Sequence, residues 1–415
     1  MHFTIFVYGT WGDIRPHVVL GMALQQAGHE VQVVASRGYE QWVRARNLGF
    51  YPLTTDVNTF AKENASIMDA NIVQQLQMAR TVLNPILTQM GLEVLEATRS
   101  SDVLMTVEFG ASLLFDVLRV NSLKTILINP APLNPTREFA SAMPPAPNWF
   151  PFPEWYNRMS YSMLERIMWS VLAGPRNTIA TKHLGLPKSK FKAFHDMLAV
   201  TPALTTVSKH VLPRPADWDE HFQVTGYLFD DDPEWQPPQD LSDFLAAGDA
   251  PVYIGFGSMP DSKPEATTRL IVDAVQRSGQ RAVILTGWAG LGADDVPPNI
   301  HILKYAPHSW LFPQMSAVIH HGGAGTTASG FRAGVPTTIV PHNGDQPYWG
   351  RRVVELGVGT APIPRKKLTA DKLAAAIAEA TTNQAMQQRA SELGKKMAVE
   401  DGVGEAVKFI QNILG

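Results

Sequence analysis

Short apolar runs alternate along the chain with longer segments in which apolar residues recur at helical spacing. The first round of this alternation predicts a strand at Phe3–Tyr8, a loop at Gly9–Arg15, a helix at Pro16–Ala27 and a second strand at Val31–Ala35. The helix is placed from Pro16 because proline is well tolerated in a first helical turn. A strand, loop, helix and strand in this order are typical of a parallel, doubly wound sheet.

The same alternation continues toward the C-terminus, with helical patterns near residues 70–99, 157–173, 264–278 and 368–382. Apolar runs predict further strands at Val103–Val107, Thr125–Asn129, Pro251–Ser258, Ala282–Thr286, His301–Lys304, Ala317–His320 and Thr337–Val340. Two such series in one chain predict an α/β protein of two Rossmann-like domains that face each other across an interdomain cleft.

Prolines, aspartates and tryptophans concentrate at residues 213–250, a composition typical of an interdomain linker. We therefore divide the chain into an N-terminal domain at 1–215, a linker region at 216–250, a C-terminal domain at 251–395 and a final helix at 396–415. We expect this final helix to pack back on the N-terminal domain. The run Asp230-Asp231-Asp232 falls in the linker, so we interpret it as solvated and predict no essential metal.

Composition narrows the classes of function. The chain has 415 residues, 45% hydrophobic and 18% charged, as in a globular protein with room for two full cores. A formal net charge of −3 gives no reason to expect a nucleic-acid partner. The absence of cysteine excludes disulfides, thiolate metal sites and a cysteine nucleophile. No signal-peptide pattern and no membrane-spanning apolar run occur, so we predict no membrane span and a cytoplasmic location.

The chemistry concentrates at residues 320–346, HHGGAGTTASGFRAGVPTTIVPHNGDQ, directly after a predicted strand. A strand, a glycine-rich turn and the start of a helix present free backbone N–H groups and a positive helix end to a phosphate. His321 and Thr326 can add side-chain donors. The GxxxxGK[ST] pattern of nucleotide-hydrolysing P-loops is absent. The pattern therefore favours a diphosphate that acts as a leaving group.

Three segments together resemble the nucleotide-sugar signature of family-one glycosyltransferases: Tyr305–Pro313, residues 320–327 and Pro341–Gly350. The sequences of these segments are most similar to those of the sterol glucosyltransferase branch, and antibiotic glycosyltransferases carry a less similar version of the motif. The loop Gly9–Pro16 also resembles the GxxGDxxP loop of that branch, whereas residues from about 55 to 245 show little resemblance. The resemblance implies the GT-B architecture, with an acceptor-binding N-terminal domain and a nucleotide-sugar-binding C-terminal domain.

The same resemblance assigns donor-binding roles. It places His321, Gly323, Gly325 and Thr326 on the diphosphate and Asp345 and Gln346 on the sugar hydroxyls. Further donor-binding positions implied by it are Gly12, Ser258, Tyr305 and His308, with Tyr305 as the ring that stacks on the base. Each position has a structural alternative: His321 as a core histidine, Asp345 as a turn residue and Tyr305 as a packing residue.

One position departs from the plant signature, because Ser329 stands where plant enzymes carry a glutamate that binds the ribose. A short hydroxyl cannot clamp two ribose hydroxyls as a carboxylate does. The sterol branch shares this absence, so nucleotide binding is expected to persist, but this position does not separate UDP from dTDP. The expected donor is UDP-glucose or a similar UDP-hexose, with a dTDP-deoxysugar as the alternative. No cofactor besides this co-substrate is predicted.

The resemblance also implies that Asp13 is the general base that accepts the proton of the acceptor hydroxyl, in an inverting transfer. The structural alternative for Asp13 is a helix N-cap. Glu108, Trp149 and Phe152 are the candidate acceptor-binding residues, although surface polarity would also explain Glu108. A hydrophobic small molecule such as a sterol, terpenoid or phenolic is the expected acceptor. Alternatives are an antibiotic-type aglycone, a nucleotide-sugar epimerase and a non-catalytic auxiliary protein.

Overall fold

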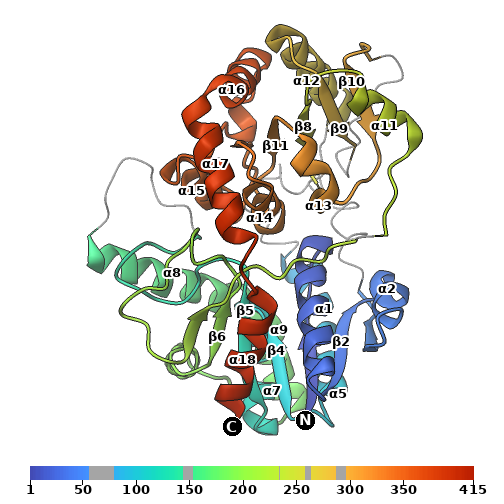
Figure 1. The fold of residues 1–415 in the computed structure, drawn as a ribbon. Helices are drawn as coiled ribbons and strands as arrows, with labels where there is room; N and C mark the ends of the chain where they lie inside the picture. The colour runs from blue at the N-terminus through green and yellow to red at the C-terminus, as the bar shows by residue number, and fades with distance from the viewer. Residues whose placement is uncertain (56–78, 144–152, 233, 258–262, 287–295) are drawn as a thin grey trace. The chain divides into compact units, whose positions relative to one another are not determined.

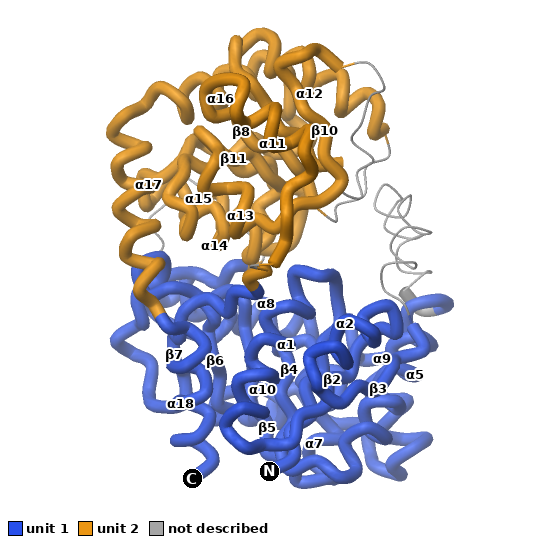
Figure 2. The backbone as a smooth tube through the Cα atoms, turned by 45° about the vertical axis from the view of Figure 1, so that its right-hand side comes forward, with its two compact units in different colours: residues 1–142, 150–230, 401–415 blue, residues 143–149, 231–400 orange. Residues whose placement is uncertain are grey.

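The computed structural model describes residues 1–55, 79–143, 153–232, 234–257, 263–286 and 296–415. These residues form two compact units, shown in Figure 2. Unit 1 contains the described residues up to 142, those from 153 to 230, and 401–415. Unit 2 contains Met143 and the described residues from 231 to 400.

Unit 1 is built on a sheet whose seven described strands are all parallel, in the order β3-β2-β1-β4-β5-β6-β7. Figure 1 labels β2, β4, β5 and β6 of this sheet. The strands are β1 (His2–Phe6), β2 (Glu30–Ser36), β3 (Gly49–Leu53), β4 (Val103–Thr106), β5 (Lys124–Asn129), β6 (Ala203–Thr205) and β7 (Phe222–Val224). Because all strands run the same way, their carboxyl ends meet at one edge of the sheet.

Helices cover both faces of this sheet, and each face has its own apolar core. The α-helices of unit 1 are α1 (Trp11–Gln26), α2 (Glu40–Arg44), α5 (Asn84–Ala97), α6 (Glu108–Leu113), α7 (Phe115–Asn121), α8 (Glu154–Val171), α9 (Ala173–Thr178), α10 (Phe191–Leu198) and α18 (Gly402–Leu414). One core contains buried residues of α5, α6, α7 and α10. The other contains buried residues of α1 and α18. Short turns of other helix types lie at Arg37–Tyr39, Ala79–Leu83 and Ile179–His183.

The last helix of the chain, α18, belongs to unit 1 and lies beside α1. Its buried residues Ala406 and Ile410 join the same core as Val18 and Leu24 of α1. Asp401 caps the helix, since its Oδ1 accepts a hydrogen bond from the Gly404 N–H at 2.8 Å. Apolar contacts and a cap therefore fix the C-terminal segment to the unit that begins the chain.

Unit 2 repeats the architecture with a five-stranded parallel sheet among the described residues, in the order β10-β9-β8-β11-β12. Its strands are β8 (Val252–Gly255), β9 (Ala282–Leu285), β10 (Ile300–Leu303), β11 (Ala317–His320) and β12 (Thr337–Ile339). Its α-helices are α11 (Gln239–Ala246), α12 (Pro264–Ser278), α13 (His308–Leu311), α14 (Ala324–Ala333), α15 (Gln346–Glu355), α16 (Ala370–Thr382) and α17 (Gln384–Met397), with 3-10 turns at Phe312–Gln314 and Arg365–Lys367. Buried residues of α12 and α16 pack on one face of the sheet and those of α11 and α13 on the other.

The first helix begins earlier than its sequence predicts. Helix α1 starts at Trp11, so Pro16 lies inside it and leaves one helical hydrogen bond unmade. Thr10 is the N-cap, and a reciprocal capping box joins it to Asp13, three residues later. These capping bonds satisfy the first N–H groups of the helix. The prediction of a loop up to Arg15 was therefore wrong, and so was the alternative in which Asp13 is the N-cap.

The segment 216–250 contains regular structure in both units. Strand β7 completes the sheet of unit 1, and α11 packs on unit 2 through the buried Leu241. The chain passes from one unit to the other between Asp230 and Asp231. Both aspartates form ion pairs inside their own units. The Asp230 side chain is only 14% exposed, so the interpretation of this run as solvated was wrong for Asp230, whereas Asp231 is exposed, as predicted. Asp230 pairs with Arg15 at 3.8 Å and Arg46 at 3.6 Å, and Asp231 pairs with Arg332 at 2.7 Å.

Candidate functional site

In each unit the strand order reverses once, and ligands of open α/β sheets bind outside the carboxyl ends of the strands at such a switch point. In unit 2 the switch lies between β8 and β11, which end at Gly255 and His320. In unit 1 it lies between β1 and β4, which end at Phe6 and Thr106. In unit 2, Gly257 and His321 follow these strand ends, and in unit 1, Asp13 and Glu108 follow them. His321, Asp13 and Glu108 are predicted site residues.

The turn after β11 is shaped by a buried histidine and a glycine. His320 is completely buried, and its Nδ1 accepts a hydrogen bond from the Gly322 N–H at 3.0 Å. Gly322 has a φ of +94°, in the left-handed region that favours glycine, and a Cβ there would lie 2.6 Å from Ile339. His320 therefore shapes the turn that precedes α14.

His321 is half-buried beside two glycines. A Cβ at Gly257 would lie 2.8 Å from its imidazole, and one at Gly323 would lie 2.5 Å from its Nε2. Burial, together with the charges of His342 and His308, lowers the pKa of His321 to about 3. The ring is therefore neutral at physiological pH and offers one N–H donor. Its Nδ1 is buried without a hydrogen-bond partner among the described residues.

Helix α14 starts directly after this turn, with Gly323 as N-cap. The N–H and the hydroxyl of Thr327 both donate to the Gly323 carbonyl at 2.9 Å, which closes the first helical turn. The N–H groups at 324, 325 and 326 belong to the first turn of a helix, where no helical partner exists. With His321 they form a cradle of donors at a positive helix end, as a diphosphate requires. The hydroxyl of Ser329 donates to the Gly325 carbonyl at 3.0 Å, so it is engaged within the helix.

Asp345 and Gln346 lie where α15 begins; Gln346 bonds to the loop before the helix, and Asp345 bonds to a side chain within it. The Gln346 Oε1 accepts hydrogen bonds from the N–H groups of His342 at 2.7 Å and Asn343 at 3.2 Å. The Asp345 Oδ2 accepts one from Nε1 of the fully buried Trp349 at 2.8 Å. Asp345 is the N-cap residue of α15 and Gln346 is the first residue of the helix, so the start of the helix holds both side chains in place.

Two further donor-binding predictions fall on the described residues of unit 2. Tyr305 follows β10 and is 46% exposed, so much of its ring can be reached by a base. His308 begins α13 and stacks on Phe312, with ring centroids 4.3 Å apart, and it also meets Tyr253 edge-on. Its ring is thus largely occupied by packing. Ser258 lies outside the described residues.

In unit 1 the carboxylate of Asp13 is held by Thr10, the N-cap residue of α1. Its Oδ2 accepts hydrogen bonds from the Thr10 N–H at 2.7 Å and the Thr10 hydroxyl at 3.2 Å. Gly9 has a φ of +150°, and a Cβ there would lie 2.2 Å from the same oxygen. Burial raises the pKa of Asp13, and the bonds from Thr10 lower it in part. Gly12, one residue earlier, is exposed in the first turn.

His17 is a neighbour of Asp13 that the sequence did not single out. Its Nδ1 donates to the Asp13 carbonyl at 2.6 Å, and the ring is buried. Burial lowers the pKa of His17 to about 4, so the imidazole is neutral at physiological pH. The only signal that could have found it is the i, i+4 spacing on one helix face. We interpret it as a residue that fixes the first turns of α1.

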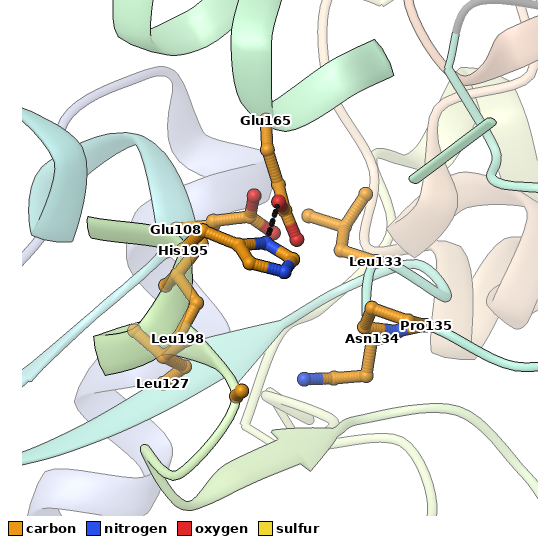
Figure 3. A pocket seen from close by; sticks show the side chains of 9 residues that line it. Glu108, Leu127, Leu133, Asn134, Pro135, Glu165, His195 and Leu198 are labelled. Carbon is orange, nitrogen blue, oxygen red and sulfur yellow. Dashed lines mark hydrogen bonds and ion pairs between the residues drawn. The ribbon is translucent and has the colours of Figure 1, made fainter. Parts of the chain in front are cut away.

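Glu108 begins α6 and is only 4% exposed, so surface polarity does not explain it. It lines a cavity of about 30 Å³ with Glu165, His195 and Asn134 (Figure 3). Burial and then the charge of Glu165 raise the pKa of Glu108 to about 8. Trp149 and Phe152, the other predicted acceptor-binding residues, lie outside the described residues.

Within the described part of the chain, no helix is both long and apolar enough to cross a bilayer. In the same part, no three His, Asp or Glu side chains are grouped so that they could hold a metal ion.

Two family models match this chain. Residues 3–97 match the glycosyltransferase family 28 N-terminal domain. Residues 270–413 match the erythromycin biosynthesis protein CIII-like C-terminal domain.

The curated relatives include sterol 3-beta-glucosyltransferases. One from Arabidopsis thaliana is 33% identical over 98% of this chain and 67% of its own length. One from Emericella nidulans is 32% identical over 99% of this chain and 30% of its own length. The chain therefore spans about two thirds of the plant relative and less than a third of the fungal one.

Solved structures of glycosyltransferases are similar over the whole chain. The glycosyltransferase of kitacinnamycin has a TM-score of 0.73 at 19% identity and covers 100% of this chain and 99% of its own. The glycosyltransferase VinC, in complex with dTDP, has a TM-score of 0.63 at 19% identity and covers 99% of both chains. At these identities the matches show the fold alone, which is the GT-B fold predicted from the sequence.

Proposed function

This chain belongs to the family of the sterol 3-beta-glucosyltransferases, and from that premise we propose that it transfers a hexose from a UDP-sugar to a hydroxyl of a lipophilic acceptor. The proposal that the acceptor is of the sterol type rests on the same relatives. The single observation that carries the proposal is the donor cradle of unit 2, in which a neutral His321 adjoins the open first turn of α14.

The donor half of the reaction rests on unit 2. The N–H groups at the start of α14 and the N–H of His321 stabilise the negative charge that grows on the diphosphate as it leaves. Asp345 and Gln346 hydrogen-bond the sugar hydroxyls, and the exposed face of Tyr305 stacks on the uracil. A neutral His321 suits this role, because its donor does not depend on protonation near pH 7.

The acceptor half rests on unit 1. The carboxylate of Asp13 accepts the proton of the acceptor hydroxyl while the oxygen attacks the anomeric carbon and the bond to the diphosphate breaks. One C–O bond forms, one breaks, the proton moves to Asp13, and UDP leaves with the bonding electrons. Attack opposite the leaving group inverts the anomeric centre. The raised pKa of Asp13 makes it a stronger base than an exposed aspartate.

The test is acceptor-dependent release of UDP from UDP-glucose, with product mass by mass spectrometry, over a panel of sterols, terpenoids and phenols. EDTA is present throughout, and dTDP-glucose is the competing donor. A hexose-shifted sterol product formed with EDTA supports the proposal. Faster turnover of the dTDP-sugar would show that the donor is a dTDP-sugar instead of a UDP-sugar. Failure to bind either nucleotide would refute the assignment of the donor cradle as a nucleotide site.

Two variants accompany this assay. Asp13→Asn should abolish most turnover while UDP binding persists. Asp273→Asn, on an exposed α12 ion pair with Arg277, is the matched control and should behave as wild type, because exposed pairs of this kind contribute little to stability.

A further inference from the structure

Glu108 follows one of the two strands that form the switch point of unit 1, and Asp13, in the first turn of α1, follows the other. Glu108 lies two residues after the end of β4, and β1 and β4 are paired neighbours whose carboxyl ends are in register at Phe6 and Thr106. The next residue, Phe109, stacks on Tyr8 with ring centroids 6.0 Å apart and planes within 13°. The start of α6 is thus packed on the segment that connects β1 to α1, the helix that carries Asp13. Ligands of such sheets bind outside the strand ends at the switch point, and Asp13 and Glu108 follow the two strand ends that form it.

The cavity beside Glu108 is lined by polar groups on one side and apolar groups on the other. Its polar side chains are Glu108 of α6, Glu165 of α8, His195 of α10 and Asn134 of the segment that follows β5. Leu127, Leu133, Pro135, Leu198 and Ala199 complete the lining (Figure 3). At about 30 Å³ the cavity has room for one or two water-sized groups, so a hydroxyl fits and a ring does not.

Three of these polar side chains have partners within unit 1. His195 Nδ1 and Glu165 Oε2 are 2.6 Å apart, close enough for an ion pair. The Asn134 Oδ1 accepts a hydrogen bond from the Asn129 Nδ2 at 3.2 Å. By contrast, the Glu108 Oε1 is buried with no hydrogen-bond partner among the described residues. A buried polar atom of this kind calls for a partner, because leaving its hydrogen bond unmade is costly.

The charges around the cavity favour a neutral partner. Since the pKa of Glu108 is about 8, its carboxyl is protonated at pH 7 and can both donate and accept a hydrogen bond. The second carboxyl, Glu165, already faces His195. A hydroxyl donates one hydrogen bond and accepts others, which matches this arrangement. An ammonium group would instead require Glu108 to ionise next to Glu165.

We propose that this cavity is a subsite for a second hydroxyl of the acceptor, remote from the hydroxyl that receives the sugar, with Glu108 as its main hydrogen-bonding partner. The proposal rests on the proposed transfer to a lipophilic alcohol and adds that the preferred acceptors are at least diols. Glu108 then determines specificity, because an acceptor without the second hydroxyl leaves its carboxyl unpaired.

The test compares androstan-3β-ol with a set of androstane diols that keep the 3β-hydroxyl and carry a second hydroxyl at different ring positions. Wild type should prefer at least one diol over the monol by about tenfold in kcat/KM, the size of one good hydrogen bond. The preference should lie in KM, with kcat little changed. Glu108→Met should abolish it, and Glu108→Gln should restore most of it, since an amide also donates and accepts.

The matched control is Glu93→Gln. Glu93 is another buried carboxylate of unit 1, but it accepts hydrogen bonds from Thr54 and Gln89. This variant should lose stability and keep the diol preference, which separates a specific effect from a general loss of folding. Circular dichroism and a thermal melt of each variant complete the control.

Equilibrium binding distinguishes failure of the subsite from failure of the proposed transfer reaction. Calorimetric titration of the monol and diols into wild type and Glu108→Met needs no donor and no turnover. Diol-selective binding that Glu108→Met abolishes supports the subsite even if no sugar is transferred, in which case the proposed function alone fails. Equal binding of monol and diols by wild type, or a preference that survives in Glu108→Met, overturns the subsite and leaves ordered water as the occupant of the cavity.

Discussion

Replacing Asp13 by asparagine separates the chemistry of this carboxylate from its structural role, because the two have different magnitudes. The amide oxygen of asparagine can still accept the hydrogen bond that the Thr10 N–H donates at 2.7 Å. What is lost is the charge-assisted part of that bond and the attraction of the charge to the helix N-terminus, together about 1–2 kcal/mol. Relief of the burial that raises the pKa of Asp13 offsets part of this loss. We therefore expect the free energy of unfolding to fall by about 1 kcal/mol or less, small against the usual 5–15 kcal/mol.

The effect on turnover should be far larger. A positioned general base contributes about 100- to 10,000-fold, which corresponds to about 2.7–5.4 kcal/mol of barrier. Asparagine cannot accept the proton, so kcat should fall by this factor while the dissociation constant of UDP stays within about threefold. In wild type the acid limb of the kcat/KM profile should lie above the ordinary range of an aspartate, because burial raises the pKa of Asp13. The variant should lack that limb.

The assay combines steady-state kinetics with urea unfolding and UDP titration on the same preparations. Thr10→Ala serves as the comparison, since removal of an N-cap hydroxyl costs about 0.5–2 kcal/mol of stability but leaves the carboxylate in place. We expect this variant to be less stable than Asp13→Asn and more active. The assignment of Asp13 as base would be refuted by an asparagine variant with near-normal kcat, or by one whose activity loss follows its loss of stability.

Three further outcomes follow from the geometry. His321→Ala should weaken UDP binding by about 10- to 100-fold in a calorimetric titration, and wild-type binding should not titrate through His321 between pH 5 and 8, because the pKa of His321 is about 3. Gly323→Ala should weaken UDP binding with little change in Tm, since its Cβ would press on the His321 ring, whereas Gly325→Ala, where a Cβ meets open space, should weaken it less. Glu108→Gln should gain stability over wild type as pH rises from about 4.5 to 8, because the unfolded chain releases this proton near 4.5 and the folded chain only near 8. Urea unfolding across that pH range measures the difference in free energy of unfolding between Glu108→Gln and wild type. A difference that shrinks with rising pH would contradict the burial of this carboxyl.

Much of the donor cradle could be predicted because it is continuous in the sequence. The strand, the glycine turn and the helix start all lie within residues 317–333, and each is set by local preferences. Strand β11 occupies the predicted residues Ala317–His320, and helix α12 occupies the predicted 264–278. A buried apolar run and a helix start marked by proline leave little freedom to tertiary contacts.

Other elements escaped prediction for identifiable reasons. Strands β6 and β7 have only three residues each, and β3 contains Pro52, which argues against a strand from sequence alone. These strands exist because neighbours in the sheet supply their hydrogen bonds. The start of α1 was misplaced because the capping box between Thr10 and Asp13 outweighs the cost of Pro16 inside the helix.

By itself, the sequence determined the class of fold, the strand and helix of the donor cradle, and the family resemblance through which Asp13 and His321 were singled out. Apolar periodicity and glycine conformation are properties of neighbouring residues, so a linear pattern records them. The tertiary structure alone decided which distant groups meet. Glu108, Glu165 and His195 come from three helices, and no spacing in the chain foretells that they line one cavity. Nor does the sequence state that Glu108 is buried, which is what raises its pKa and changes it from a surface acid into a hydrogen-bond donor at pH 7.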